Sequence, residues 1–292
     1  MAAIVRRFAK WASWLLPHGV LVARRAWMSR ATSNGPALVS ADVLSGNRLL
    51  QGRHAGERCF ILGNGPSVKG VNLLALRGET VISVSNGYLH KDYAAIAPRY
   101  HCLPQVASSV MTKADLVAWF NEMHERLGDA ELFLNETEAA VVRDHELFKG
   151  RKVHYLALRD NFDDWPSREI VDISNPVPGV ESVPIMAIMI AMYLGFTNIH
   201  LLGVDHSHFK SGEYVYAFNL GVQANKDAAV GADGQVVISR HDDFQSLARL
   251  WRQYRVLREI AESNEVEITN ATPGGELDEF LRLDFGTLMG EK

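Results

Sequence analysis

The segment "LGNGPS", residues 62–67, places a glycine-bracketed turn directly after the apolar run "CFIL". Gly63 and Gly65 have no side chains, so a phosphate or a ribose can approach main-chain amides there. Asn64 and Ser67 add polar groups to the same turn. A turn of this kind after a strand lies where open α/β sheets bind ligands, and we expect all four residues to contact one. A tight connection between strand and helix is the alternative.

The next apolar run ends in "VISVSNGY", which places Asn86 where dinucleotide-binding enzymes carry an acidic residue. The glycine turn also lacks the third glycine of that fingerprint. It lacks the Gly-Lys-Ser/Thr ending of a P-loop as well, because "PSV" stands there. These differences disfavour an ordinary NAD enzyme, a P-loop NTPase and a methyltransferase that binds ribose through a carboxylate. The Asn86 amide suits a base edge or a sugar hydroxyl instead.

The sequence gives no sign of a structural metal site. Cys59 and Cys102 lack partners at the spacing of metal ligands, and the 11 histidines are scattered. We therefore expect no metal. Two cysteines also cannot staple a small secreted domain, so a reducing cytoplasm is favoured.

These residues need a scaffold, and the chain of 292 residues alternates apolar runs with helical patterns. The alternation predicts an α/β fold with a Rossmann-like, mainly parallel sheet, helices on both faces and a single nucleotide-binding domain. The expected strands are 59–62, 80–84, 131–134, 152–156, 198–204 and 266–269, and the expected helices are about 113–127, 137–147, 183–194 and 243–264. Helix 183–194 is apolar all round, so we expect it in the interior. The weakly periodic segment 219–240 is expected to be a surface loop and a lid.

The N-terminal segment differs from the rest of the chain in charge. Six lysines and arginines precede the first acidic residue, Asp42. The formal charge of the whole chain is −4, so the remainder carries about −10. The basic residues alternate at helical spacing with an apolar stripe, which consists of Ile4, Phe8, Trp11 and Leu15. We predict a basic arm and connector over residues 1–50 and an α/β domain over 51–292.

We expect this arm to be an amphipathic helix on an anionic membrane surface. Its longest uncharged run, residues 11–23, is shorter than the roughly 20 apolar residues that span a bilayer. The predicted location is therefore cytoplasmic and peripheral to the inner face of the membrane. Packing of the arm on its own domain, or on a second subunit of a homo-oligomer, is the alternative.

Three segments resemble the family-42 glycosyltransferases, the bacterial lipooligosaccharide sialyltransferases. They are "FILGNGPSVKGVNLLAL…TVISVSNGYLH", "SVPIMAIMIAMYLGFTNIHLLGVDHSHF…YVYAFN" and the histidine of "SRHDDFQSL", and they lie within residues 58–90 and 182–280. The chain also resembles the broader 6-hydroxymethylpterin diphosphokinase-like proteins. That second resemblance rests on the Gly-Pro-Ser turn, the Asp-His-Ser segment and the ending "ITNATPGGELDEF".

The first resemblance implies a role for several side chains. Asn64 and Asn86 would bind the cytidine nucleotide or the donor sugar, and Tyr216 would stabilise the leaving phosphate. Tyr214 would be a second phosphate donor, although its segment is longer here than in the family. His241 would be the general base, a task that histidine suits at neutral pH.

The resemblance also implies an inverting transfer from a nucleotide-activated sugar, of the CMP-sialic acid kind, to a glycolipid or polysaccharide acceptor. No separate cofactor and no nucleic acid partner are expected. Asp205 ends the strand of "LLGVD", so we place it at the binding site too, with a turn cap as its alternative role. Two family segments differ here: "VPGVESVP" has no arginine, and at best Gln105 replaces an Asn-Pro asparagine. These differences leave the donor sugar open.

The lack of any Asp-x-Asp triplet favours glycosyl transfer. Metal-dependent glycosyltransferases use such a pair to hold a divalent ion, whereas a CMP-sugar leaves as a phosphate monoester that needs none. Transfer of a diphosphate from ATP normally requires magnesium held by carboxylates. Two alternatives stay open: ATP-dependent diphosphate transfer to a pterin-like alcohol, and an accessory protein that binds a nucleotide sugar without turning it over.

Overall fold

A computed structural model describes the chain over residues 41–104, 112–160, 162, 165, 170–211, 217 and 240–290. Several sequence predictions fall outside these residues. They are residues 1–40 of the basic arm, Gln105, Tyr214, Tyr216 and all but the last residue of the 219–240 loop.

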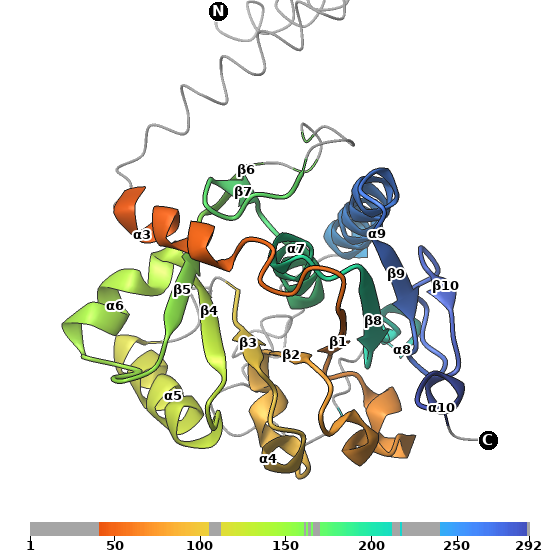
Figure 1. The fold of residues 1–292 in the computed structure, drawn as a ribbon, viewed down its shortest axis with the longest axis horizontal. Coiled ribbons are helices and arrows are strands. Elements are labelled where there is room, and N and C mark those ends of the chain that lie inside the picture. The colour runs from red at the N-terminus through yellow and green to blue at the C-terminus, as the bar shows by residue number, and fades with distance from the viewer. Residues whose placement is uncertain are drawn as a thin grey trace, which may run out of the picture.

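The centre of the described structure is a sheet of eight strands in the order β10-β9-β8-β1-β2-β3-β4-β5. Every neighbouring pair in it is parallel. Figure 1 shows the sheet crossing the molecule from β5 on the left to β10 on the right. The strands are β1 (Arg58–Leu62), β2 (Val81–Val84), β3 (Tyr100–Cys102), β4 (Glu131–Asn135), β5 (Val153–Leu156), β8 (Asn198–Leu202), β9 (Glu267–Asn270) and β10 (Leu281–Arg282). A separate pair joins β6 (Leu158–Asp160) and β7 (Val177–Pro178).

The direction in which the strands are added reverses beside β1. The chain adds β2 to β5 on one side of β1 and then returns to place β8 on its other side. The carboxyl ends of β1 and β8 therefore meet at the topological switch point, where open α/β sheets bind ligands. The predicted Rossmann-like α/β architecture is confirmed.

Helices cover both faces of the sheet. Cys59 and Ile61 of β1 pack in one cluster with α7 and α9, while Phe60 and Leu62 pack on the other face with η3, η4 and α10. A strand buried on both faces is expected to be apolar throughout, as β1 is. The helices are α3 (Ala41–Ser45), η2 (Gly46–Leu50), η3 (Pro66–Gly70), η4 (Leu73–Leu76), η5 (Ser85–Leu89), α4 (Tyr93–Ile96), α5 (Lys113–Arg126), η6 (Glu136–Glu138), α6 (Ala139–Asp144), α7 (Val183–Leu194), α8 (His208–Ser211), α9 (Arg240–Ser263) and α10 (Phe285–Leu288).

Helix α7 has the bounds and the interior position that its sequence predicts. Pro184 lies in its first turn, where the missing N–H would have had no partner within the helix. The helix ends at Gly195, whose φ of +92° is the left-handed conformation that glycine adopts readily. All of its residues except Val183 and Met192 are buried.

Residues 41–50 pack against the sheet. Residues 41–50, which we expected to be part of a connector, form α3 and η2. Asn47 donates hydrogen bonds to the carbonyl oxygens of Tyr155 and Ile173, at 2.8 and 2.9 Å, and Leu50 is buried in the main core. Long-range contacts therefore tie this segment to the sheet.

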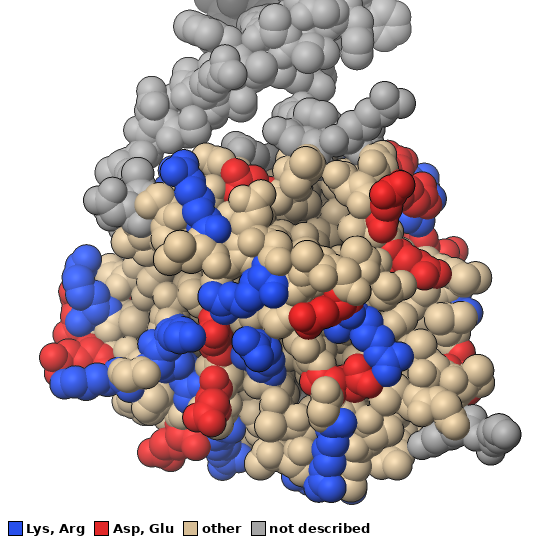
Figure 2. Space-filling view, viewed as in Figure 1, with Lys and Arg blue, Asp and Glu red and all other residues tan. Residues whose placement is uncertain are grey.

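The surface seen in Figure 2 mixes both charges. Lysine and arginine side chains lie among aspartates and glutamates over this face, and they do not form one continuous basic surface. Within the described residues, no helix has both the length and the apolar character needed to cross a bilayer.

Candidate functional site

Two turns meet at the switch point, one after β1 and one after β8. The Gly63 N–H donates to the carbonyl oxygen of Leu202 at 2.7 Å, and the Gly65 N–H donates to that of Gly203 at 2.9 Å. These bonds continue the pairing of β1 with β8 beyond the ends of both strands. They also engage two of the amides that we expected to bind a phosphate.

The two glycines of the first turn make room for the second turn. A Cβ atom on Gly63 would overlap the Gly203 carbonyl oxygen, and one on Gly65 would overlap the Asp205 carboxylate. Any larger residue would push the turns apart. The missing side chains of these glycines therefore serve close packing of β1 against β8, and their contact with a ligand stays a prediction.

Asp205 holds the first turn in place. Its carboxylate accepts hydrogen bonds from the Ser67 N–H at 3.1 Å and from the Ser67 hydroxyl at 2.7 Å. Burial raises the pKa of Asp205, and the bonds from Ser67 oppose that rise. The Asp205 carbonyl oxygen also accepts the N–H of Glu276 at 2.7 Å, which brings the loop after β9 to the same edge. Asp205 and Ser67 thus lie at the predicted edge, where the Asp205 carboxylate bonds to Ser67.

Asn64 lies between the carboxyl ends of β1 and β2. Its side-chain nitrogen donates to the Val84 carbonyl oxygen at 3.0 Å. Its side-chain oxygen Oδ1 is buried and has no hydrogen-bond partner among the described residues. Ala217 donates its backbone N–H to the Asn64 carbonyl oxygen at 2.9 Å. Because most buried polar atoms have a partner, the Asn64 oxygen points to an incomplete site.

Asn86 follows β2 in η5 and is also buried. Its side-chain oxygen accepts the indole N–H of Trp119 at 3.0 Å, and the same N–H also contacts the Tyr88 hydroxyl at 3.0 Å. These bonds fix the orientation of the carboxamide. The Asn86 side-chain nitrogen has no hydrogen-bond partner within the described chain, so it remains a donor for a ligand.

Strained backbone lies beside Asn86 and beside Asp205. Ser85, immediately after β2, has a φ of +49°, and His206, immediately after Asp205, has a φ of +48°. Residues other than glycine rarely adopt this conformation, and it recurs at functional sites. Both strained residues lie at the carboxyl edge of the sheet.

A buried histidine, His101, holds the backbone at Ser85 in place. The sequence alone predicts no function for it. The His101 Nε2–H donates to the Ser85 carbonyl oxygen at 2.8 Å, and the Ser83 hydroxyl lies 2.7 Å from His101 Nδ1. Burial lowers the pKa of His101 to about 3, so the ring is neutral at physiological pH. The neutral ring therefore fixes the turn that carries Asn86. The polar residues Ser83 and His101 lie directly opposite each other in β2 and β3, and this pair is the sequence feature that could have identified the interaction.

His241 lies in the first turn of α9, is exposed and contacts Gln245 at 2.9 Å. Helix α9 leads into the parallel strand β9, so its first turn lies at the carboxyl edge. Among the described residues, no hydrogen bond or ion pair joins His241 to Asn64 or Asp205. Tyr214 and Tyr216 are not among the residues that the structure describes, so their roles stay predictions.

At the carboxyl edge of the sheet, the polar groups of the described residues are mainly carboxamides and hydroxyls. Asn64, Ser67, Asn86 and Asp205 lie together around the ends of β1, β2 and β8, and His241 lies on the same edge of the sheet. In the part of the chain that the structure describes, no three His, Cys, Asp or Glu side chains group as metal ligands would. The geometry can orient a neutral polar ligand through carboxamides.

No protein-family model matches the sequence, and no curated protein matches it. Among solved structures, the chain is similar to the sialyltransferase CstII from Campylobacter jejuni in complex with a substrate analogue, cytidine-5'-monophosphate. The identity is 14% and the TM-score 0.42, over 78% of this chain and 85% of that chain. It is also similar to the sialyltransferase Cst-II in complex with trisaccharide acceptor and CMP, at 15% identity and a TM-score of 0.42, over 78% and 86%. The function of this chain is therefore inferred from its own residues.

Proposed function

We propose that the chain is an inverting, metal-independent glycosyltransferase that uses a nucleotide-activated sugar, with CMP as the nucleotide. The observation that carries this proposal is the buried Asn64 oxygen, which has no hydrogen-bond partner among the described residues and lies between the ends of β1 and β2, beside the switch point. A ligand donor that bonded this oxygen would complete the site.

The proposed ligand contacts come from neutral groups. An amino group on a pyrimidine edge, or a sugar hydroxyl, can donate to the Asn64 oxygen, and the Asn86 amide nitrogen can donate to a carbonyl or hydroxyl of the same ligand. Trp119 and His101 orient the Asn86 segment, so little side-chain freedom is lost on binding. The lack of an Asp-x-Asp triplet supports a donor that leaves as a phosphate monoester.

We assign the chemistry to two further residues. His241 would remove the proton of the acceptor hydroxyl as that oxygen attacks the donor sugar, which inverts its anomeric centre. Tyr216 would donate a hydrogen bond to the departing phosphate, with Tyr214 as a second donor. Support for Tyr216 comes from its neighbour in sequence, Ala217, whose backbone N–H binds the Asn64 carbonyl oxygen.

The acceptor in this proposal is a glycolipid or polysaccharide of the cell surface. The basic N-terminal arm would keep the enzyme at the cytoplasmic face of an anionic membrane, where a lipid-linked acceptor is available. The motivation is the cluster of six basic residues before Asp42 and their apolar stripe.

A panel of thermal-shift measurements tests the proposal. CMP, CDP, UDP and ATP, each with magnesium or with a chelator, are added to the full chain. The proposal expects stabilisation by CMP with the chelator present. Stabilisation by ATP with magnesium, and no response to CMP, would refute it and favour diphosphate transfer. Stabilisation by CMP without turnover of any CMP-sugar over a range of acceptors would favour the accessory binding protein.

A further inference from the structure

A cavity lies at the opposite edge of the sheet, before the amino ends of β4 and β5. Its volume is about 360 Å³, within the range of roughly 300 to 1,000 Å³ that small-molecule sites occupy. It is lined by His124, Gly128, Asp129, Glu131, Lys149, Gly150, Arg151 and Lys152. None of these residues belongs to the site at the carboxyl edge.

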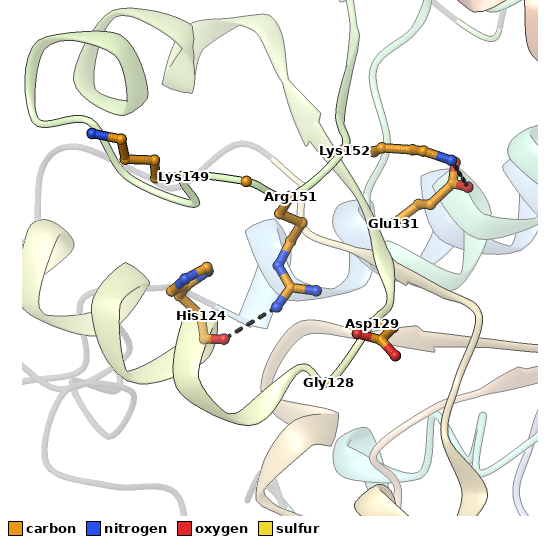
Figure 3. A pocket seen from close by; sticks show the side chains of 8 residues that line it. His124, Gly128, Asp129, Glu131, Lys149, Arg151 and Lys152 are labelled. Atoms are coloured by element: carbon orange, nitrogen blue, oxygen red, sulfur yellow. Dashed lines mark hydrogen bonds and ion pairs between the residues drawn. The ribbon is translucent and has the colours of Figure 1, made fainter.

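Arg151 is the central cation of this cavity. Figure 3 shows its side chain between His124 and Asp129, while Lys149 and Lys152 extend to either side. The guanidinium donates to the carbonyl oxygens of Ala130 at 2.7 Å and His124 at 3.1 Å, which fixes its orientation. These two bonds use two of its five N–H donors.

The charge of Arg151 is not neutralised by an ion pair within the described chain. Burial lowers its pKa, and the nearby Asp129 carboxylate opposes that effect without forming an ion pair. A partly buried cation is normally paired with an acid. Arg151 instead contacts main-chain dipoles, which leaves its positive charge available to an anion.

The other acid in the lining is already engaged. Glu131 pairs with Arg53 at 2.9 Å, with His154 at 2.9 Å and with Lys152 at 3.2 Å. Burial favours its neutral form, but the hydrogen bonds from these three groups outweigh burial and lower its pKa to about 2. With Glu131 engaged by these three groups, the other charged residues of the lining are Arg151, Asp129 and Lys149. The Lys149 side chain is exposed, and its ammonium lies 4.0 Å from the equally exposed Glu146 carboxylate, a weak pair that water screens.

We propose that this cavity binds the phosphate group of a small phosphorylated molecule, with Arg151 as its anchor and Lys149 as a second cation. A guanidinium held in one orientation suits phosphate oxygens, which accept two parallel hydrogen bonds. The volume exceeds that of a bare phosphate ion, so the remainder of the ligand is expected to fill the cavity towards Gly128 and Gly150. This site is independent of the proposed glycosyl transfer.

The test uses the full chain, isothermal titration calorimetry and amide NMR spectra. Inorganic phosphate, glucose 6-phosphate and glucose are the probes. We expect glucose 6-phosphate to bind more tightly than inorganic phosphate, glucose not to bind, and the amides of Gly128 and Gly150 to shift. Absence of saturable binding of both phosphates at millimolar concentration, or shifts confined to the carboxyl edge, would overturn the proposal.

Variants separate binding from folding. Arg151→Gln should weaken glucose 6-phosphate about tenfold or more, since it removes charged hydrogen bonds. Lys149→Gln, at an exposed side chain, should weaken it about two- to fivefold, and Asp129→Asn should tighten it by a similar factor. Arg143→Gln is the matched control, because Arg143 is exposed and pairs with Asp144 outside the lining.

The Asp129 variant keeps the test decisive if Arg151→Gln fails to fold. A structural role alone predicts no tighter binding in Asp129→Asn, so an unchanged or weaker affinity in that variant would contradict the proposal. If the chain binds CMP at the carboxyl edge, its affinity for CMP should be the same in all four variants. Failure of the phosphate-site proposal can therefore be distinguished from failure of the proposed function.

Discussion

Replacement of Asp205 by alanine should destabilise the domain through the turn after β1. Asp205 is 8% exposed, and its carboxylate accepts both the N–H and the hydroxyl of Ser67. Alanine removes both carboxylate oxygens, which are the acceptors. The half-buried N–H and hydroxyl of Ser67 must then bond to water or stay unpaired. The turn that carries Asn64 would then be held to β8 only by main-chain bonds.

The expected loss follows from these two bonds. A hydrogen bond to a charged group contributes about 1.5 to 3 kcal/mol, so two bonds set an upper limit of about 6 kcal/mol. Burial opposes the charge, as the raised pKa of Asp205 indicates, so the net loss is smaller. We expect a decrease in the free energy of unfolding of about 2 to 4 kcal/mol for Asp205→Ala. In a domain of this size, that lowers the melting temperature by about 4 to 16 °C.

The assay is urea unfolding at equilibrium for four proteins: wild type, Asp205→Ala, Ser67→Ala and the double variant. Ser67→Ala removes only the hydroxyl bond and should lose about 1 to 2 kcal/mol. The double variant should lose less than the sum of the single variants, because both changes break the same contact.

The pH dependence gives a second measure, with Asp205→Asn as the reference. The folded pKa of Asp205 is raised above its ordinary value of 3.8, so protonated Asp205 is favoured in the folded state. The stability of the wild type relative to Asp205→Asn should be highest below that ordinary value and should decrease as the pH rises through the folded pKa. Equal stability of wild type and Asp205→Ala, together with additive losses in the cycle, would refute the structural role of Asp205.

Three further predictions concern separate parts of the chain. His241→Ala should abolish turnover of a CMP-sugar and leave CMP affinity within about threefold, since a general base acts only on the acceptor. His145→Ala, at an exposed histidine, is the control. Unchanged turnover in His241→Ala would remove His241 from the mechanism. Deletion of residues 1–30 should release the protein from anionic liposomes in a sedimentation assay, and persistent binding would place the membrane contact elsewhere. The pKa of Glu131 is lowered to about 2 from an ordinary 4.5 by hydrogen bonds from its three partners, so the ionised carboxylate stabilises the folded state at neutral pH. Because the folded pKa is lowered, this stabilisation should disappear as the pH falls from about 4.5 through 2, and a Glu131→Gln variant with the same acid sensitivity would contradict it.

The main elements of the fold could be predicted from apolar patterns. Strand β1 is apolar because it is buried on both faces, and α7 is apolar all round because it lies inside. Strand β10 was not predicted, since its two residues, Leu281 and Arg282, are exposed and form no apolar run. The segment 41–50 looked like a connector because its anchors are a single asparagine and a single leucine, Asn47 and Leu50.

The candidate site could be predicted only in part. The positions of Asn64 and Asn86 follow from the strand ends, and the structure places both at the carboxyl edge. The local sequence could not show why Gly63 and Gly65 are glycines, because the groups that they pack against, Gly203 and Asp205, are about 140 residues later in the chain. The pairing of β1 with β8, on which those contacts depend, is a property of topology and not of local sequence.

Calorimetric titration of CMP in the presence of a chelator tests the central claim most directly, with Asn64→Ala and the exposed control Asn72→Ala as variants. We predict saturable binding by the wild type and by Asn72→Ala, and affinity at least about tenfold weaker in Asn64→Ala, which loses the carboxamide at the switch point. The same unfolding assay should show Asn64→Ala to be folded. CMP binding of equal strength in the wild type and in Asn64→Ala, or no CMP binding by the wild type, would contradict the account.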